Sequence, residues 1–196
     1  MGGVRKDKEE RTIALLEKCF ACFCENGLED TGMKKLAAAC DISGGNFFNT
    51  YFRTKDEIVI RATAHCMTKV EDDFMSRAPQ SMDEVEQFIR EMPYITEREH
   101  GKKYRFMYQV YCSPKYREQG EEFFSGVTKR YAEYAAELAP KLGMPQEVIT
   151  PLIFIFVRAC VHYAMFRNED YLKPQIELIL MMIGELKEKY PVQEKK

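Results

Sequence analysis

The chain has 196 residues, of which 45% are hydrophobic and 31% charged, and its formal net charge is −2. These fractions are typical of a soluble globular protein with a sizeable core. The longest apolar run, 151–157, is interrupted by Arg158 and is shorter than the ~18 residues of a membrane span, so we expect no membrane partner. The charged start of the chain lacks the apolar core of a secretory signal, which predicts a cytoplasmic protein.

The first predicted helix covers residues 6–26, where Ile13, Leu16, Phe20 and Phe23 repeat on one face. Gly27 is expected to end it. Cys19, Cys22 and Cys24 form a C-x-x-C-x-C run inside this helix. Because the chain has an odd number of cysteines, seven, and no signal, we expect reduced thiols. The three cysteines are either small buried hydrophobic residues or a redox-sensing or metal-sensing group.

Residues 31–58 predict two short helices joined by a tight turn and followed by a third helix. Thr31 is a candidate N-cap for the first, 33–40, and Ile42 is the expected buried residue of the turn. Ser43 is expected to cap the second, 44–50. Residues 54–57 read as a capping box that opens the third. A helix–turn–helix of this size places its second helix in the major groove of DNA.

This segment resembles the N-terminal DNA-binding domain of TetR/AcrR-like transcriptional regulators over roughly residues 11–60. The matching residues are Gly27, Thr31, Leu36-Ala37, Ile42-Ser43, Gly45, Phe47-Phe48, Tyr51-Phe52 and Lys55-Asp56-Glu57. The rest of the chain matches the family only in length and in its all-helical character. The resemblance implies an all-α fold with a helix–turn–helix DNA-binding domain at 1–54 and a helical ligand-binding and dimerisation domain at 55–196.

Two departures from the family pattern concern DNA recognition. Seven residues separate Ser43 from Tyr51, one more than the family usually has, and the extra residue falls near Asn49-Thr50. If the helix continued, this residue would rotate its end by about 100°. Gly44 stands where the family often has Lys or Arg. A family member with weakened DNA binding therefore remains an alternative.

The family resemblance implies which positions contact DNA, and the net charge of residues 1–55 indicates how strongly they attract phosphates. The candidates are Thr31, Lys34, Lys35, Gly44, Gly45, Asn46, Phe48, Asn49, Tyr51 and Lys55. Asn46 and Asn49 have the best base-reading chemistry, since an Asn amide can pair with adenine. Residues 1–55 hold nine Lys/Arg and eight Asp/Glu, a charge of only +1. Such a domain must depend on dimerisation and backbone contacts as well as on phosphate attraction.

Further helices are predicted at 55–77, from Ser81 to about 92, and at 97–112, 114–139, 151–167 and 174–190, with Pro79, Pro140 and Gly143 as breaks. Aromatic residues are frequent between 94 and 166. The resemblance implies that a small molecule, partly apolar or aromatic, binds in this half. The candidate ligand-binding residues are His65, Tyr104, Met107, Tyr108, Tyr111, Phe124, Tyr131, His162, Tyr163 and Phe166, and plain core packing is the alternative for each.

The last two predicted helices are apolar on more than one face. Because little of the chain follows them, we expect a partner subunit to bury the faces that this chain leaves exposed. The resemblance implies that they form a homodimer interface. Its candidate residues are Leu152, Ile155, Phe156, Ala159, Tyr163, Ile176, Ile179, Leu180 and Ile183. A two-fold dimer would read a palindrome in double-stranded operator DNA.

The leading hypothesis is a homodimeric repressor that a small-molecule effector releases from its operator. Only the resemblance to the family favours a repressor over an activator. A thiol-based sensor regulator is an alternative. An enzyme is not expected, because the chain has no G-x-S-x-G, P-loop or HExxH motif and no paired-histidine metal spacing. No catalytic residue, cofactor or metal is therefore predicted.

Overall fold

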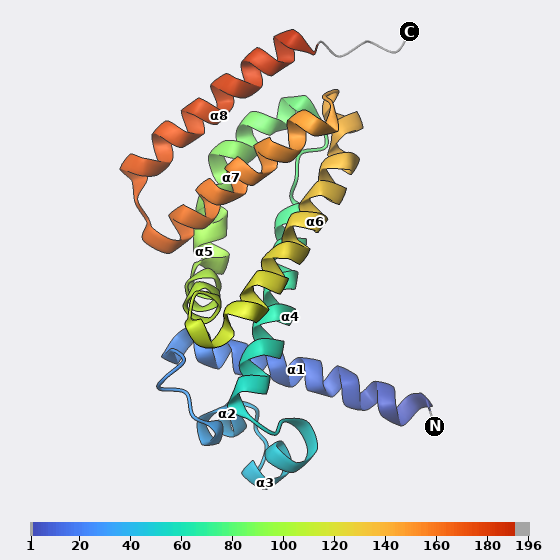
Figure 1. Ribbon diagram of the computed structural model, residues 1–196, viewed down its shortest axis with the longest axis vertical. Coiled ribbons are helices and arrows are strands. Elements are labelled where there is room, and N and C mark those ends of the chain that lie inside the picture. The colour runs from blue at the N-terminus through green and yellow to red at the C-terminus, as the bar shows by residue number, and fades with distance from the viewer. Residues whose placement is uncertain (1, 191–196) are drawn as a thin grey trace. The chain divides into compact units, whose positions relative to one another are not determined.

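The computed structural model describes residues 2–190, with side chains from residue 6 onward, and within this range every regular element is helical. The α-helices are α1 (Gly2–Asn26), α2 (Met33–Ala39), α3 (Gly44–Asn46), α4 (Lys55–Ser76), α5 (Val85–Tyr111), α6 (Arg117–Leu142), α7 (Gln146–Phe166) and α8 (Glu169–Lys189) (Figure 1). A π-helical turn, Phe47–Tyr51, follows α3, and 3₁₀ turns at Met82–Glu84 and Pro114–Tyr116 precede α5 and α6. The all-α prediction is confirmed.

The chain divides into two compact units. Unit 1 comprises the residues up to Asp72 together with Arg105–Glu121, and unit 2 comprises Asp73–Tyr104 and the chain from Glu122 onward. The predicted boundary after residue 54 therefore differs from the observed division. The reason is that most of α4 and the α5–α6 connection pack with the N-terminal helices rather than with the C-terminal ones.

The core of unit 1 joins α1 to the end of α5 through aromatic rings. Phe106 stacks on Phe23 with ring centroids 5.2 Å apart and meets Phe20 edge-on at 5.5 Å. All three rings are buried. Gly27 ends α1 with φ +81°, as predicted, since glycine adopts the left-handed conformation without strain. Ile13, predicted on the apolar face of this helix, is 37% exposed.

Proline positions misled the prediction of helix ends in unit 2. Pro93, Pro151 and Pro174 lie inside α5, α7 and α8, and the predicted helices to 92 and 97–112 form the single helix α5. α8 begins earlier than predicted because the Asn168 side chain caps it, accepting the Tyr171 amide at 3.1 Å. Likewise α6 continues through Pro140 and stops before Gly143, which has φ +67°.

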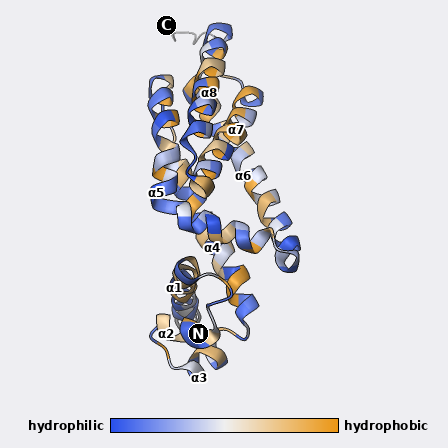
Figure 2. Cartoon of the chain, turned by 90° about the vertical axis from the view of Figure 1, so that its left-hand side faces the viewer, coloured by the Kyte–Doolittle hydropathy of each residue, from blue (hydrophilic) through white to orange (hydrophobic). Residues whose placement is uncertain are grey.

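Hydrophobic residues gather along α7, which lies beside α8 (Figures 1 and 2). Among the described helices, α7 alone is long and apolar enough to cross a membrane by length and composition, and a third of its apolar window is buried in the chain. This corrects the expectation that no segment reaches that length. A core helix of a soluble protein passes the same test, so the finding is weak evidence for a membrane span.

Candidate nucleic-acid interface and ligand cavity

The helix–turn–helix of unit 1 is formed by α2, a tight turn and α3 with its π-turn. The turn is closed by the Ile42 amide, which donates to the Ala37 carbonyl at 3.2 Å, and Asp41 takes the left-handed conformation with φ +56°. Ile42 is half-buried rather than buried as predicted. Ser43 stands at the N-cap position of α3, as expected, but its side chain makes no capping bond.

The recognition segment, for which the family resemblance predicts an extra residue near Asn49-Thr50, ends in the π-turn. The Phe52 amide donates to the Phe47 carbonyl at 3.1 Å, five residues back, and Phe52 then leaves the helix in extended conformation. In an α-helix, five residues turn about 500°, so these two positions would lie about 140° apart. The wider turn instead lets both rings lie in the core, with centroids 5.2 Å apart. The condition for the predicted 100° rotation, a continuing α-helix, is therefore not met.

The segment from Ser43 to Phe52 contains no charged residue, and its outer surface is small and polar. Gly45, Asn46, Asn49 and Thr50 are exposed, whereas Gly44, Phe48 and Tyr51 are half-buried. Phe47 is fully buried, as expected for a core residue. The recognition segment therefore offers amide and hydroxyl groups rather than cations.

The predicted phosphate-contacting residues lie in different environments. Lys34 and Lys35 are exposed on α2. Lys55 donates from its ammonium to the Leu28 carbonyl at 2.5 Å, which ties the start of α4 to the end of α1. The capping box at the same end is present in part, with the Glu57 amide donating to the Thr54 hydroxyl at 3.1 Å.

The prediction for Thr31 is wrong on both counts. Its side chain is fully buried and its hydroxyl donates to the Gly27 carbonyl at 2.6 Å, so it offers nothing to DNA. The N-cap position of α2 is Gly32. The hydroxyl satisfies the end of α1 instead of the start of α2.

Two arginines near the recognition segment were not among the predicted residues. The Arg11 guanidinium lies 5.8 Å from the centre of the Tyr51 ring, and that of Arg61 lies 5.6 Å from the centre of the Phe52 ring. Arg61 also pairs with Glu57 at 2.8 Å. Arg11 lies in α1, some twenty residues before the motif, and Arg61 lies in α4, nine residues after Phe52, so the spacing within the motif does not include them. Arg11 adds an exposed cation beside Tyr51.

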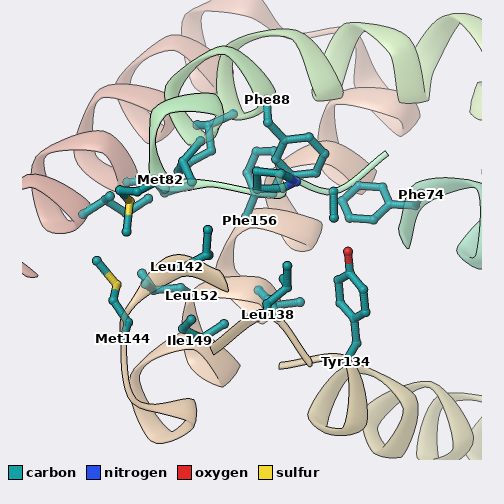
Figure 3. A pocket seen from close by; sticks show the side chains of 17 residues that line it. Phe74, Met82, Phe88, Tyr134, Leu138, Leu142, Met144, Ile149, Leu152 and Phe156 are labelled. Carbon is teal, nitrogen blue, oxygen red and sulfur yellow. The ribbon is translucent and has the colours of Figure 1, made fainter. Parts of the chain in front are cut away.

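Unit 2 holds an apolar cavity of about 80 Å³. It is lined by Phe74, Ala78, Pro79, Met82, Val85, Phe88, Ile89, Tyr134, Leu138, Leu142, Met144, Ile149, Leu152, Ile153, Phe156, Ile179 and Ile183. Met82 and Met144 lie at one end, and Phe74 and Tyr134 at the other (Figure 3). Since drug-sized ligands occupy about 300–1,000 Å³, a ligand of that size requires the lining to open.

Tyr134 brings the one hydroxyl of the lining, and that hydroxyl is already satisfied. It donates to the Met75 carbonyl at 2.8 Å. Burial raises the pKa of Tyr134 to about 12, so the phenol is neutral at physiological pH. A cavity without an unpaired polar group selects an apolar moiety, because a polar one would lose its hydrogen bonds to water.

None of the ten predicted ligand-binding residues lines this cavity. His65 pairs with Glu17 at 3.2 Å in unit 1, and Met107 and Tyr111 are buried in that unit's core. Tyr104 and Tyr131 are buried in unit 2, and Tyr163 donates to Glu169 at 2.8 Å. Tyr108 and Phe124 are half-buried, and Phe166 is 65% exposed. The prediction followed aromatic residues, whereas the cavity is lined mainly by aliphatic ones.

The fold of the chain is that of known transcriptional regulators. A regulator of the TetR/AcrR type from Aquifex aeolicus VF5 superposes with a TM-score of 0.53 at 21% identity, over 90% of this chain and 99% of the other. The FadR repressor of Thermus thermophilus, in complex with lauroyl-CoA, gives 0.54 at 16%, over 90% and 93%. FadR of Bacillus subtilis, in complex with stearoyl-CoA, gives 0.52 at 15%, over 84% and 95%.

The chain has the TetR/AcrR fold. No family model matches the sequence, and no curated protein matches it. At these identities the likeness concerns the fold, which the resemblance at residues 11–60 predicted.

The last two helices of this TetR-like fold bury part of the predicted dimer interface within the chain itself. Phe156, Ala159, Ile176, Ile179 and Ile183 are buried, so the prediction is wrong for these five residues. They face the core of unit 2, and three of them line the cavity. Leu152, Tyr163 and Leu180 are half-buried, and Ile155 is exposed.

An exposed apolar surface nevertheless remains on both helices. We call it the α7–α8 strip, and it consists of the half-buried His162 and the exposed residues Ile155, Phe166, Tyr171, Leu178 and Met181. The His162 ring lies 4.9 Å from Phe166 and 4.7 Å from Tyr171, which joins the two helices. Leu178 is 52% exposed and Met181 57%. Several large exposed apolar side chains on two neighbouring helices favour an interaction surface here.

One group of potential metal ligands occurs among the described residues of the TetR-like fold, namely Asp73, Glu99 and His100. His100 Nε2 lies 2.9 Å from Asp73. Arg77 already pairs with Asp73 at 3.1 Å and with Glu99 at 2.6 Å. A divalent cation would have to displace this guanidinium, so the group is an ion-pair network rather than a metal site.

Two of the seven cysteines face each other in the core of unit 1. Cys19 Sγ and Cys40 Sγ are 3.5 Å apart, and both residues are buried. Cys22 and Cys24 are half-buried, and burial raises the pKa of Cys22. The hydrogen bond with Cys40 and burial raise the pKa of Cys19 as well, and a thiol with a raised pKa is a poor nucleophile, which favours the structural interpretation for Cys19 and Cys22.

Proposed function

We propose that this protein is a homodimeric, DNA-binding transcriptional regulator whose binding to a palindromic operator is controlled by a small apolar ligand. The observation that carries the proposal is the helix–turn–helix of unit 1, in which Asn46, Asn49 and Thr50 are exposed beyond a buried Phe47. A TetR-like fold around this motif supports it. Repression is the mode that one neighbour suggests, since FadR of Thermus thermophilus is a transcriptional repressor.

The DNA contacts are proposed to come from two groups of residues. Lys34, Lys35 and Arg11 attract phosphates, and the polar residues of the recognition segment face the base edges. Because the N-terminal part of the chain is nearly neutral, tight binding requires two copies of it. The α7–α8 strip is proposed to join those copies.

The effector is proposed to place an apolar chain or ring in the cavity of unit 2. The Thermus thermophilus and Bacillus subtilis neighbours hold fatty acyl-CoA molecules. A slender aliphatic chain suits the aliphatic lining here, and it could enter with less displacement of the lining than a broad ring system. The ligand must bind the DNA-free state more tightly than the DNA-bound state to act as an inducer.

The first test is a fluorescence-anisotropy titration of the full chain with DNA from beside its gene, at two salt concentrations. We expect tight, salt-dependent binding of one dimer to a palindrome. In the variant Lys34→Ala/Lys35→Ala the slope of log K against log salt should fall by about four, because the dimer loses two lysines from each copy. Absence of specific binding at low salt would contradict the proposed function. It would support the alternative of a TetR-like protein with weakened DNA binding.

The ligand is tested separately with lauroyl-CoA as the probe. We expect it to lower the affinity of the wild type for DNA. The effect should be smaller in Ile153→Phe, because the larger side chain of this lining residue fills part of the cavity. Met165→Phe, on the same helix but outside the lining, is the matched control. An unchanged response in Ile153→Phe would show that lauroyl-CoA acts elsewhere. No response to lauroyl-CoA in the wild type would exclude this ligand class while leaving the DNA-binding part intact.

A further inference from the structure

The π-turn shapes the exposed end of the recognition segment. Phe47 and Phe52 are both fixed in the core, so the four residues between them must follow the wide turn. Thr50 is thereby exposed one turn beyond Asn46, and its hydroxyl donates to Asn46 Oδ1 at 2.6 Å. The two side chains form one hydrogen-bonded unit on the outer surface.

Few other side chains of this segment can read a base. Gly44 and Gly45 have none, and a side chain at Gly45 would meet open space. Phe47 is buried. Together with Asn49, the Asn46–Thr50 unit therefore supplies the exposed polar chemistry of residues 44–50, and this chemistry is uncharged.

The hydrogen bond fixes the orientation of the Asn46 amide. An Asn side chain recognises adenine when its Oδ1 accepts from N6 and its amide nitrogen donates to N7. The Thr50 hydroxyl takes one lone pair of Oδ1 and leaves the other lone pair and both N–H groups available. A preset amide loses less rotational freedom on binding than a free one. The methyl group of Thr50 is suited to contact the C5-methyl group of thymine.

We propose that Asn46 and Thr50 form a composite reader of A·T pairs in each half-site, in which Asn46 bonds to an adenine and the Thr50 methyl contacts a neighbouring thymine. This rests on the proposed DNA-binding function and extends it to the base that is read. The π-turn positions Thr50, and Thr50 positions Asn46.

The test is selection of bound sequences from a randomised duplex pool by the full-length protein, followed by affinity measurements on the selected site. We expect an A·T pair at a fixed position in each half-site. Asn46→Ala should reduce the preference at that pair by about 5- to 150-fold, with little change elsewhere in the site. Thr50→Val, which keeps a methyl group but has no hydroxyl, should weaken the preference at the same pair.

A second pair of measurements isolates the Thr50 methyl group. Replacing the contacted thymine by uracil removes only the C5-methyl group, and we expect this to weaken binding by the wild type. Thr50→Ser keeps the hydroxyl and lacks the methyl, so it should show no loss with uracil. Unchanged thermal unfolding of each variant confirms that the fold is intact.

The outcomes distinguish failure of the Asn46–Thr50 reader from failure of the proposed DNA-binding function. Specific binding with unchanged base preferences in Asn46→Ala, or selection of G·C pairs at the position that Asn46 affects, would overturn the composite reader alone. Lack of sequence-specific binding by the wild type would overturn the proposed function together with the reader.

Discussion

The Phe47 carbonyl accepts the amide of Phe52 across a turn of five residues, and both rings lie in the core of unit 1. The π-turn therefore holds both rings in the core and leaves Asn49 and Thr50 exposed between them.

The first prediction concerns the anchoring ring. Phe47→Ala should lower the free energy of unfolding by about 3–5 kcal/mol, because it removes a fully buried aromatic side chain. Phe48→Ala, at the half-buried neighbouring position, is the matched comparison and should cost clearly less. Urea denaturation followed by circular dichroism measures both, and equal losses would mean that Phe47 is not the anchor.

The second prediction concerns two glycines of α6. A Cβ atom at Gly120 would lie 2.9 Å from both Cβ and the carbonyl oxygen of Tyr111, so Gly120→Ala should destabilise the fold by about 1–3 kcal/mol. Gly126 has open space around it, and Gly126→Ala should stabilise the helix by about 0.5–1 kcal/mol. The unfolding temperatures should shift in opposite directions, and an unchanged or raised unfolding temperature for Gly120→Ala would refute the close approach of α6 to Tyr111.

The third prediction concerns the dependence of stability on pH. Hydrogen bonds from Lys115 at 2.6 Å and Tyr116 at 2.7 Å lower the pKa of Asp56. Its folded-state pKa is thus below the unfolded value of about 3.9. The bonds stabilise the fold above that value, and the stabilisation disappears as the pH falls through the folded pKa.

Asp56→Asn should accordingly unfold at a lower temperature than the wild type near neutral pH, and the difference should shrink toward pH 3. Differential scanning calorimetry across this range gives the comparison. Asp30→Asn, at an exposed loop position, is the control for loss of a surface carboxylate. A difference for Asp56→Asn that stayed constant with pH would show that the carboxylate is not the group responsible.

The fourth prediction concerns thiol reactivity. Cys112 is exposed, whereas Cys19, Cys40, Cys66 and Cys160 are buried. Under native conditions iodoacetamide should therefore modify Cys112 first and the four buried thiols only on unfolding, as read by peptide mass spectrometry. Fast native modification of Cys19 or Cys40, coupled to a change in DNA affinity, would instead support a thiol-based sensor.

The fifth prediction concerns the α7–α8 strip. Leu178→Glu/Met181→Glu should convert a dimer into a monomer in sedimentation velocity, because the charges would be buried without partners at the interface. Ile13→Glu, which changes an exposed apolar residue of unit 1, should leave the dimer unchanged. A wild-type monomer, or a dimer that survives the double substitution, would exclude this strip as the interface.

Local sequence patterns determined much of unit 1. Apolar spacing and the signals at Gly27, Ser43 and Thr54 located the helix–turn–helix, because caps and left-handed glycine positions act within a few residues. The same rules failed at Pro93, Pro151 and Pro174, because a proline in a helical pattern predicts a helix boundary. There the helix continues, although proline has no amide hydrogen to complete its backbone hydrogen bond.

Only the tertiary structure decided where the sites lie. The apolar faces of α7 and α8 predicted burial, but the sequence does not distinguish burial within the chain, as at Ile179, from exposure for a partner, as at Leu178. The cavity likewise draws its lining from α4, α5, α6, α7 and α8, which no local pattern connects. The spacing of apolar residues shows which face of a helix is apolar. The packing of helices that are distant in sequence decides whether that face is buried within the chain or left exposed.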